Sequence, residues 1–309
     1  MGLSRNTLLW ASKNEWLKRH IPELKFTQRA LKRFMPGTTA EEAISAAKEL
    51  IAFKIHTTFT ILGENITSLE EAEKNTQHYI VLLDKIKNEN LDTEISLKLT
   101  QIGFDLSFDK SFELFSSIVS KAKIFNNNIF IDMEDSSYVD KTITFYKKIK
   151  ETYNNVGLCL QAYLYRTLND LKNIIDINSW IRLVKGAYKE SSSVAIQKLA
   201  QVNRNYMLLS EYLLDQIKEK GIRVAFGTHD LIIQEQVKKI AKEVGIQKNQ
   251  FEFQMLYGIK TSEQYKLAAN GFNIRTLISY GKHWYPWYMR RLAERPANIG
   301  FVLKNIFNK

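Results

Sequence analysis

Seven residues, Glu94-Ile95-Ser96-Leu97-Lys98-Leu99-Thr100, alternate between polar and apolar side chains. This period of two is typical of a β-strand. Charged segments with helical periodicity lie on both sides of it, at 68–88 and 109–125. A strand between two helices of crossover length is the repeating unit of a parallel sheet, so this stretch predicts an α/β fold.

The same alternation of strand and helix continues outward in both directions. Short β-branched or apolar segments predict strands at 55–62, 94–100, 129–133, 156–164, 180–184, 222–226, 251–256 and 273–279. Helical patterns follow them at 68–88, 109–125, 139–153, 168–175, 194–220, 232–244, 261–269 and 284–298. Eight such units over roughly 250 residues predict a closed, distorted (βα)8 TIM-type barrel. An open, doubly wound sheet is the alternative, and the absence of a Gly-x-Gly-x-x-Gly or Walker motif weakens it.

Additional helices precede the barrel. Residues 3–33 have a helical pattern, and Thr39 is placed as the N-cap of a second, shorter helix. We therefore predict an N-terminal helical arm at 1–50 that packs on a barrel at 51–309.

Composition narrows the class of protein. The 309-residue chain carries a net charge of +11, which favours anionic partners, but no nucleic-acid-binding motif is present. The single cysteine, Cys159, excludes an internal disulfide and a cysteine-based zinc cluster, and we predict no metal site. No apolar run is long enough to span a membrane and no signal peptide is recognisable, so we expect a cytoplasmic protein. Its charge and amphipathic ends suit reversible docking on the inner face of the cytoplasmic membrane, although solvated faces explain the same charge.

The ends of the predicted strands carry polar residues. In a TIM barrel the active site lies at the C-terminal strand ends, and a polar residue in an apolar strand is costly unless it is paired or functional. Seven of the eight units supply such residues, among them Glu64, Lys98, Asp132, Gln161, Arg182, Lys185, His229, Gln254, Arg290 and Arg291. This pattern indicates an enzyme.

Structural explanations compete with the functional ones at several of these positions. Lys98 could form a core ion pair with Asp132, Gln161 and Gln254 could bridge strands, and His229 could belong to a helix cap. The last helix, from Trp284, carries adjacent arginines among large aromatic residues. It is either a basic surface helix or a clamp for a carboxylate or phosphate.

Two classes of function remain open on the residues alone. One is a Schiff-base or lyase-type barrel that uses Lys98 or Lys185 as the nucleophile. The other is a flavin-dependent barrel in which the arginines hold an anionic substrate.

Several motifs together resemble one family. They are Ser96-Leu97-Lys98-Leu99, Ile131-Asp132-Met133-Glu134, Leu160-Gln161-Ala162-Tyr163, Arg182-Leu183-Val184-Lys185-Gly186-Ala187-Tyr188, Thr228-His229, Phe253-Gln254-Met255-Leu256-Tyr257-Gly258 and Arg290-Arg291-x-x-Glu294, in this order. The chain resembles the flavin-dependent proline dehydrogenase family in its short, monofunctional bacterial form. The resemblance implies a distorted (βα)8 barrel with FAD across its strand ends, oxidation of L-proline to pyrroline-5-carboxylate, and reoxidation of the flavin by a membrane quinone.

The resemblance also implies roles for individual residues. Arg290 and Arg291 match the pair that grips the substrate carboxylate, with Lys98 as a third cation, and these three with Asp132 form the expected catalytic set. Glu64 matches an acid that pairs with the first arginine, Glu294 one that orients the pair, and Leu183 a residue that packs on the substrate ring. Arg182 matches a residue near the flavin N5 atom. The other expected flavin contacts are Asp132, Gln161, Lys185, Gly186, Ala187, Thr228, His229 and Gln254.

The last strand departs from the family pattern. The family's eighth strand usually reads Arg-x-Tyr, with the tyrosine beside the substrate, whereas this chain has Arg275-Thr276-Leu277. Leu277 would give a more apolar wall without a hydroxyl, and Tyr280, three residues on, is a candidate to replace it. A related cyclic imino acid such as hydroxyproline is therefore the alternative substrate.

Overall fold

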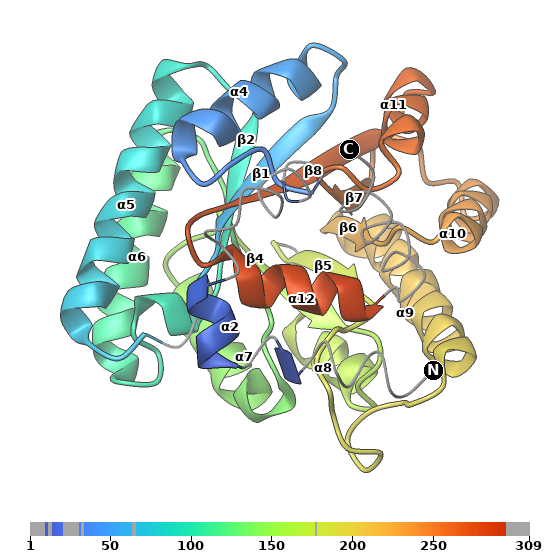
Figure 1. The fold of residues 1–309 in the computed structure, drawn as a ribbon. Coiled ribbons are helices and arrows are strands. Elements are labelled where there is room, and N and C mark those ends of the chain that lie inside the picture. Colours follow the sequence, from blue (N-terminus) through green and yellow to red (C-terminus); the bar gives the residue numbers. More distant parts are fainter. Residues whose placement is uncertain are drawn as a thin grey trace.

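The computed structural model describes residues 10–11, 14–20, 31, 34–63, 66–176 and 178–294. In this part of the chain eight parallel strands pair in chain order, and β8 closes the sheet against β1. Helices follow the strands and surround the barrel (Figure 1). The predicted closed barrel is confirmed, and the open-sheet alternative is wrong because an open sheet has no pairing between its first and last strands.

The elements follow the predicted order. The strands are β1 His56–Ile61, β2 Thr93–Leu97, β3 Ile129–Ile131, β4 Val156–Gln161, β5 Trp180–Val184, β6 Arg223–Gly227, β7 Glu252–Leu256 and β8 Asn273–Tyr280. The helices are α2 Glu15–His20, α4 Ala40–Ile51, α5 Leu69–Asn88, α6 Phe108–Ile124, α7 Val139–Lys150, α8 Thr167–Ile174, α9 Leu199–Lys220, α10 Leu231–Glu243, α11 Thr261–Ala269 and α12 Trp284–Glu294, with two 3-10 helices, η2 Leu99–Ile102 and η3 Ser136–Tyr138.

Strands β2 and β3 are shorter than predicted. β2 was expected to reach residue 100, but it ends at Leu97 and the chain turns into η2; β3 was expected to reach 133 and ends at Ile131. Lys98 and Asp132 consequently lie just beyond their strands, at the C-terminal end of the barrel, which we call the mouth.

The start of helix α9 was also predicted wrongly. The helical pattern was expected from residue 194, whereas α9 begins at Leu199. Val194 and Ala195 instead pair with the segment after β4: Tyr165 donates its N–H to the Val194 carbonyl, and Leu164 forms a bridge with Ala195. Residues 185–198 are therefore a long loop at the mouth.

The N-terminal arm is described only in part. The predicted cap is confirmed, because the Thr39 hydroxyl accepts the Glu42 N–H at 3.3 Å and the Glu42 carboxylate accepts the Thr39 N–H at 3.0 Å. Most of residues 3–33 lie outside the described residues, and the division into an arm at 1–50 and a barrel at 51–309 stays a prediction.

Apolar packing holds the helices against the barrel. All five residues of β2 and all six of β4 are buried, as expected for strands covered on both faces. At the mouth, Trp284, Tyr285 and Tyr288 of α12 are buried in a cluster with Met35 and with Leu62, which directly follows β1. Helix α12 therefore begins over the mouth, and Figure 1 shows it lying across the strands.

Candidate active site

The mouth collects the predicted site residues that the structure describes. Lys98 and Asp132 directly follow β2 and β3, Gln161 ends β4, Arg182 lies within β5, Lys185 to Ala187 follow it, Thr228 and His229 follow β6, and Gln254 and Leu277 lie on β7 and β8. Because the carboxyl ends of all eight strands meet at one end of a parallel barrel, the residues share a single face of the molecule.

Three of the side chains at the mouth form a connected triad. Arg182 Nη1 donates to Asp132 Oδ1 at 2.8 Å and lies 2.8 Å from Ser96 Oγ, which itself donates to Asp132 Oδ1 at 2.8 Å. The triad joins β2, the end of β3 and β5 across the barrel interior. Asp132, which the sequence offered as a partner for Lys98, is held by Arg182 and Ser96.

Two hydrogen-bond donors of Arg182 have no acceptor in the described part of the chain. Its side chain is 4% exposed, and its guanidinium lies 4.3 Å from the centre of the Phe130 ring. Within the described residues, its Nε and Nη2 groups have no hydrogen-bond partner although both are buried. Unpaired buried donors are costly, so their presence indicates a position where a ligand supplies the acceptors.

Gln161 combines a structural role with an unpaired atom. Its Nε2 donates to the Glu134 carbonyl at 3.1 Å and so bridges β4 to the turn after β3, as its structural explanation proposed. Its Oε1 is buried and has no partner in the described residues. The side chain of Glu134, which the sequence did not single out, is buried and accepts the Thr100 hydroxyl at 2.9 Å, which fixes that turn.

The segment after β5 makes a tight turn against the Tyr163 ring. Gly186 has φ +103°, and a Cβ at this position would lie 2.1 Å from the Tyr163 ring. Lys185 Nζ pairs with Asp230 Oδ2 at 2.8 Å, and Ala187 is exposed. Only glycine fits this conformation and contact, so the turn needs glycine for its own packing, and a cofactor role for Gly186 stays a prediction.

The polar residues after β6 and on β7 are held by hydrogen bonds to the end of β7 or to residues two positions away. His229 Nε2 accepts the Leu256 N–H at 2.8 Å, so the neutral ring carries its proton on Nδ1. Thr228 Oγ1 accepts the Asp230 N–H at 3.1 Å. Gln254 donates to Glu252 on its own strand rather than across strands.

Leu277 and Tyr280 lie on opposite faces of β8. The Tyr280 hydroxyl bonds His78 Nε2 of α5 at 2.7 Å, so this ring faces the outer helices rather than the barrel interior. Burial lowers the pKa of His78, which keeps its ring neutral. Tyr280 therefore does not replace the family's tyrosine, whose position is taken by Leu277 in this chain.

Of the remaining predicted site residues, the structure places one away from the triad, and the side chains of the other four lie outside the described residues. Leu183 is fully buried, and alternation along β5 assigns it to the face opposite Arg182, which weighs against its expected contact with the substrate. Arg290, Arg291 and Glu294 lie on α12, but their side chains fall outside the described residues, as does Glu64.

The sequence did not single out the charged layer at the opposite end of the barrel, which we call the floor. It consists of Glu94, Arg223, Glu252 and Arg275. Arg223 donates to both oxygens of Glu94, Arg275 Nε bonds Glu252 Oε2 at 3.0 Å and Arg275 Nη1 bonds the Thr57 carbonyl at 2.7 Å. The two arginines lower the pKa of Glu94 to about 2 despite its burial.

Phe130 separates the floor from the triad. The Arg182 guanidinium lies 4.3 Å and the Arg223 guanidinium 5.5 Å from the centre of its ring. Gly157 on the neighbouring strand makes room for the ring, since a Cβ there would lie 2.4 Å from it. The Phe130 ring thus lies between the triad and the floor, and the bond from Gln254 to Glu252 connects the mouth to the floor along β7.

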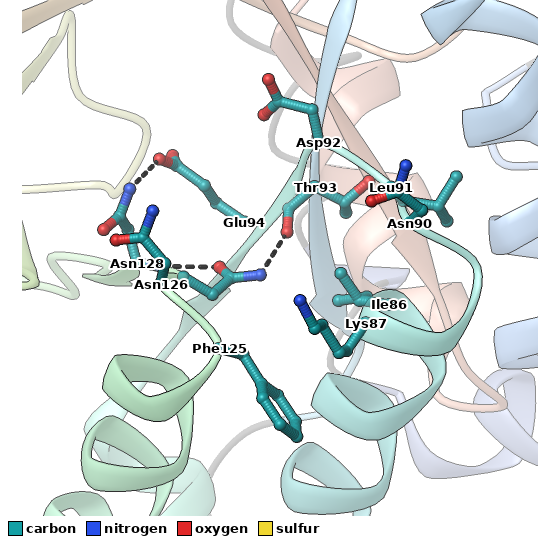
Figure 2. Close-up of a pocket in the computed structure, with 11 residues that line it drawn as sticks. Ile86, Lys87, Asn90, Leu91, Asp92, Thr93, Glu94, Phe125, Asn126 and Asn128 are labelled. Atoms are coloured by element: carbon teal, nitrogen blue, oxygen red, sulfur yellow. Dashed lines mark hydrogen bonds between the residues drawn. The ribbon is translucent and has the colours of Figure 1, made fainter.

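A surface pocket opens below the floor, at the ends of α5 and α6 and the starts of β2 and β3. Figure 2 shows the Asn128 amide bonded to the Glu94 carboxylate beside it. This pocket is at the N-terminal end of the strands, away from the candidate active site.

The donors and acceptors at the mouth fit a flavin. An isoalloxazine ring presents several acceptors and one N–H donor, which complement the unpaired donors of Arg182 and the unpaired acceptor of Gln161. No cluster of three or more His, Cys, Asp or Glu side chains suited to a metal ion occurs in the described part of the chain. Nor does any helix described there have the length and apolar character that crossing a membrane requires.

Comparison with known sequences identifies close relatives. The sequence model of the family described as proline dehydrogenase matches residues 43–304. Proline dehydrogenase 1 of Bacillus subtilis strain 168 is 37% identical over 305 residues, which cover 99% of both chains. The proline dehydrogenase of Deinococcus radiodurans is 35% identical over 279 residues, or 89% of both chains.

Comparison with solved structures supports the fold. Proline utilization A from Bdellovibrio bacteriovorus, inactivated by N-propargylglycine, superposes with a TM-score of 0.78 over 97% of this chain at 23% sequence identity. This chain spans 37% of the length of that protein.

Proposed function

Since the chain belongs to the proline dehydrogenase family, we propose that it oxidises L-proline to pyrroline-5-carboxylate with FAD as the cofactor. The observation that carries the proposal is Arg182, a buried guanidinium at the mouth of a TIM-type barrel whose Nε and Nη2 have no hydrogen-bond partner among the described residues. Family membership also favours flavin chemistry over the lyase-type alternative based on Lys98 or Lys185.

The residues at the mouth would hold and orient the cofactor. When bound, FAD would supply the hydride acceptor at the N5 atom of its ring. Arg182 would donate its spare N–H groups to the ring, and Asp132 and Ser96 keep the guanidinium in place. Gln161, Lys185, Gly186, Ala187, Thr228, His229 and Gln254 are the further residues that we propose for cofactor binding.

The substrate would be held by its carboxylate. We assign Arg290, Arg291 and Lys98 to this group, with Glu64 and Glu294 orienting the arginines. Three cations on one carboxylate fix the position of the ring, and α12 begins over the mouth as this role requires. Proline must react with a neutral nitrogen, because the nitrogen lone pair assists the departure of hydride from the adjacent carbon.

A visible absorption spectrum of the purified protein tests the proposal. We expect a yellow protein with flavin bands that bleach when L-proline is added without oxygen. A protein that stays colourless after incubation with FAD, or a flavin spectrum that L-proline and hydroxyproline both leave unchanged, would overturn it.

Leu277 favours a second candidate substrate. Leu277 supplies no hydroxyl where the family has a tyrosine beside the substrate. Tyr280 does not supply it either, because its hydroxyl bonds His78 on the other face of β8. A related cyclic imino acid such as hydroxyproline is therefore the second candidate. The test is the ratio of kcat/KM for L-proline and trans-4-hydroxy-L-proline in the wild type and in Leu277→Tyr; an identical ratio would remove the role of Leu277.

A quinone at a membrane surface is the electron acceptor that we propose. The net charge of +11 suits an anionic leaflet, and Trp10 and Trp16 in the N-terminal arm are 62% and 64% exposed. Sedimentation with anionic liposomes should retain the protein at low salt and release it at high salt. Turnover with a soluble quinone should exceed turnover with oxygen, and the reverse order would argue against a quinone.

A further inference from the structure

The loop between β5 and α9, residues 185–198, begins with three of the residues that we assign to the cofactor site. Its second half is attached to the segment after β4: Ile196 donates to the Tyr163 carbonyl at 2.8 Å, and Leu164 bridges to Ala195. In its first half, the Lys185 carbonyl still accepts the Tyr163 N–H at 2.9 Å. No backbone pairing with a neighbouring strand continues through 186–190 in the described part of the chain, so we ask which side chains hold this stretch.

One attachment lies at the start of this half. Lys185 Nζ pairs with Asp230 Oδ2 at 2.8 Å. Asp230 is the N-cap of α10, where it accepts the Ile232 N–H at 3.1 Å. The loop is thus fixed to the β6 side of the mouth.

The other attachment is made by Glu190. Its Oε1 accepts the Ser136 N–H at 2.7 Å, and its Oε2 accepts the Ser136 hydroxyl at 2.6 Å. Both carboxylate oxygens are therefore bound by one residue of the turn after β3. Ser136 is the first residue of η3, which leads directly into α7, so the carboxylate fixes the loop to the segment that precedes α7.

The two attachments hold the backbone between them at both ends. Between them, Gly186 adopts φ +103° against the Tyr163 ring. A segment fixed at both ends is ordered before the ligand arrives, whereas a free segment must be ordered at the expense of binding energy.

We propose that Glu190 is a positioning residue of the cofactor site, which fastens the loop after β5 to the turn after β3 and so holds Lys185, Gly186 and Ala187 ready for the flavin. This inference rests on the proposed use of FAD. It predicts that loss of the Glu190 carboxylate weakens cofactor binding without unfolding the barrel.

FAD dissociation from the holoenzyme on dilution, followed by flavin fluorescence, measures the effect. We expect FAD to bind about tenfold more weakly in Glu190→Gln, because the amide loses the charge and one of the two acceptors. Ser136→Ala, which removes only the hydroxyl, should have a smaller effect, and the double variant should be no weaker than Glu190→Gln alone. The matched control is Glu235→Gln, since Glu235 is 72% exposed and pairs only with Lys238 in the described part of the chain; it should bind FAD normally.

Hydrogen exchange of the same proteins separates this inference from the proposed function. Amides in 186–193 should exchange faster in Glu190→Gln, while those of the barrel strands and the urea unfolding midpoint stay unchanged. Equal FAD affinity or equal loop protection in Glu190→Gln and wild type would overturn the positioning role. A wild-type protein without flavin would overturn the proposed function, and the exchange measurement would still decide whether Glu190 holds the loop.

Discussion

The floor and the mouth of the barrel contain similar side chains in different states. At the floor, Glu94 and Glu252 balance Arg223 and Arg275, and each of the four has at least two charged partners. At the mouth, Arg182 has one carboxylate partner among the described residues, Asp132, and two donors that find no acceptor there. The charges of the floor are balanced within the floor, and we propose that a bound cofactor supplies the acceptors that Arg182 lacks at the mouth.

This difference indicates that the floor contributes to the stability of the barrel and the mouth to ligand binding. A buried charge network whose members are all paired stabilises the arrangement of the strands that it joins, and removal of one member leaves uncompensated charge. A buried guanidinium with donors to spare costs stability until a ligand binds it. We therefore expect substitutions at the floor to affect folding, and substitutions at the mouth to affect the cofactor.

Removal of Glu94 should have the largest effect on stability. Glu94→Leu leaves Arg223 and Arg275 to share Glu252 as their buried acid, and we expect a loss of about 3 kcal/mol in the free energy of unfolding. Urea denaturation measures it. Glu70→Gln, which alters an exposed pair with Lys74, is the control and should change little. A small loss in Glu94→Leu would show that the floor is not a stabilising network.

Acid should weaken the floor in a defined range. The pKa of Glu94 and that of Asp92 are lowered to about 2, below their ordinary values near 4, because Arg223, Arg275 and His56 favour the charged forms. A lowered folded-state pKa gives stability that is present above the unfolded pKa and is lost as pH falls from about 5 to about 2. Urea midpoints measured across this range should fall in the wild type and fall less steeply in Glu94→Leu. If the urea midpoints of the wild type and Glu94→Leu fell equally with pH, Glu94 would not be the group whose protonation weakens the floor.

Two arginine substitutions compare the layers directly. Arg182→Lys removes the planar donor fork at the mouth, and we expect kcat/KM to fall about 100-fold with a small change in the unfolding midpoint. Arg223→Lys at the floor should show the opposite pattern, a clear loss of stability with nearly normal turnover at low temperature. Steady-state kinetics and urea denaturation of both proteins suffice, and the same pattern in both would remove the distinction between the layers.

Gly157 tests the aromatic ring between the layers. Gly157→Ala brings a Cβ within 2.4 Å of the Phe130 ring, and a well-packed core loses about 1–3 kcal/mol on such overpacking. Phe130→Leu combined with Gly157→Ala should recover part of the loss, because the smaller side chain gives way. Additive losses in the double variant would show that the two positions do not interact.

Tyr280 should give the smallest effect, since it belongs to neither layer. Tyr280→Phe removes the bond to His78, and we expect a loss of about 1 kcal/mol in stability. The ratio of kcat/KM for L-proline and hydroxyproline should stay the same. A changed ratio would place the Tyr280 hydroxyl near the substrate and contradict its position on the outer face of β8.

The sequence predicted the barrel well because each unit repeats a local signal. Period-two strands and period-3.6 helices identify the elements, and the parallel order follows from their alternation. The wrong boundary before α9 arose because the apolar residues at 194–196 lie directly before the helical pattern of α9, although this segment pairs with the strand-like stretch after β4. Such pairing depends on a partner far along the chain.

The floor was missed although the sequence contains a signal for it. Glu252 and Arg275 lie two positions before Gln254 and Leu277, so alternation places them on the same face, directly below those predicted site residues. Their partners could not be predicted, because Glu94 and Arg223 are 129 residues apart. The bond between Glu190 and Ser136 could not be predicted either, because the two residues are 54 positions apart.

The single thiol of the chain offers a way to observe motion of the barrel. Cys159 is buried on β4, and burial raises its pKa to about 12, so a thiol reagent finds neither access nor thiolate in the closed barrel. Labelling must wait until the strands separate. Its rate under native conditions therefore reports how often the barrel opens, and its dependence on FAD shows whether the cofactor at the mouth keeps the barrel closed.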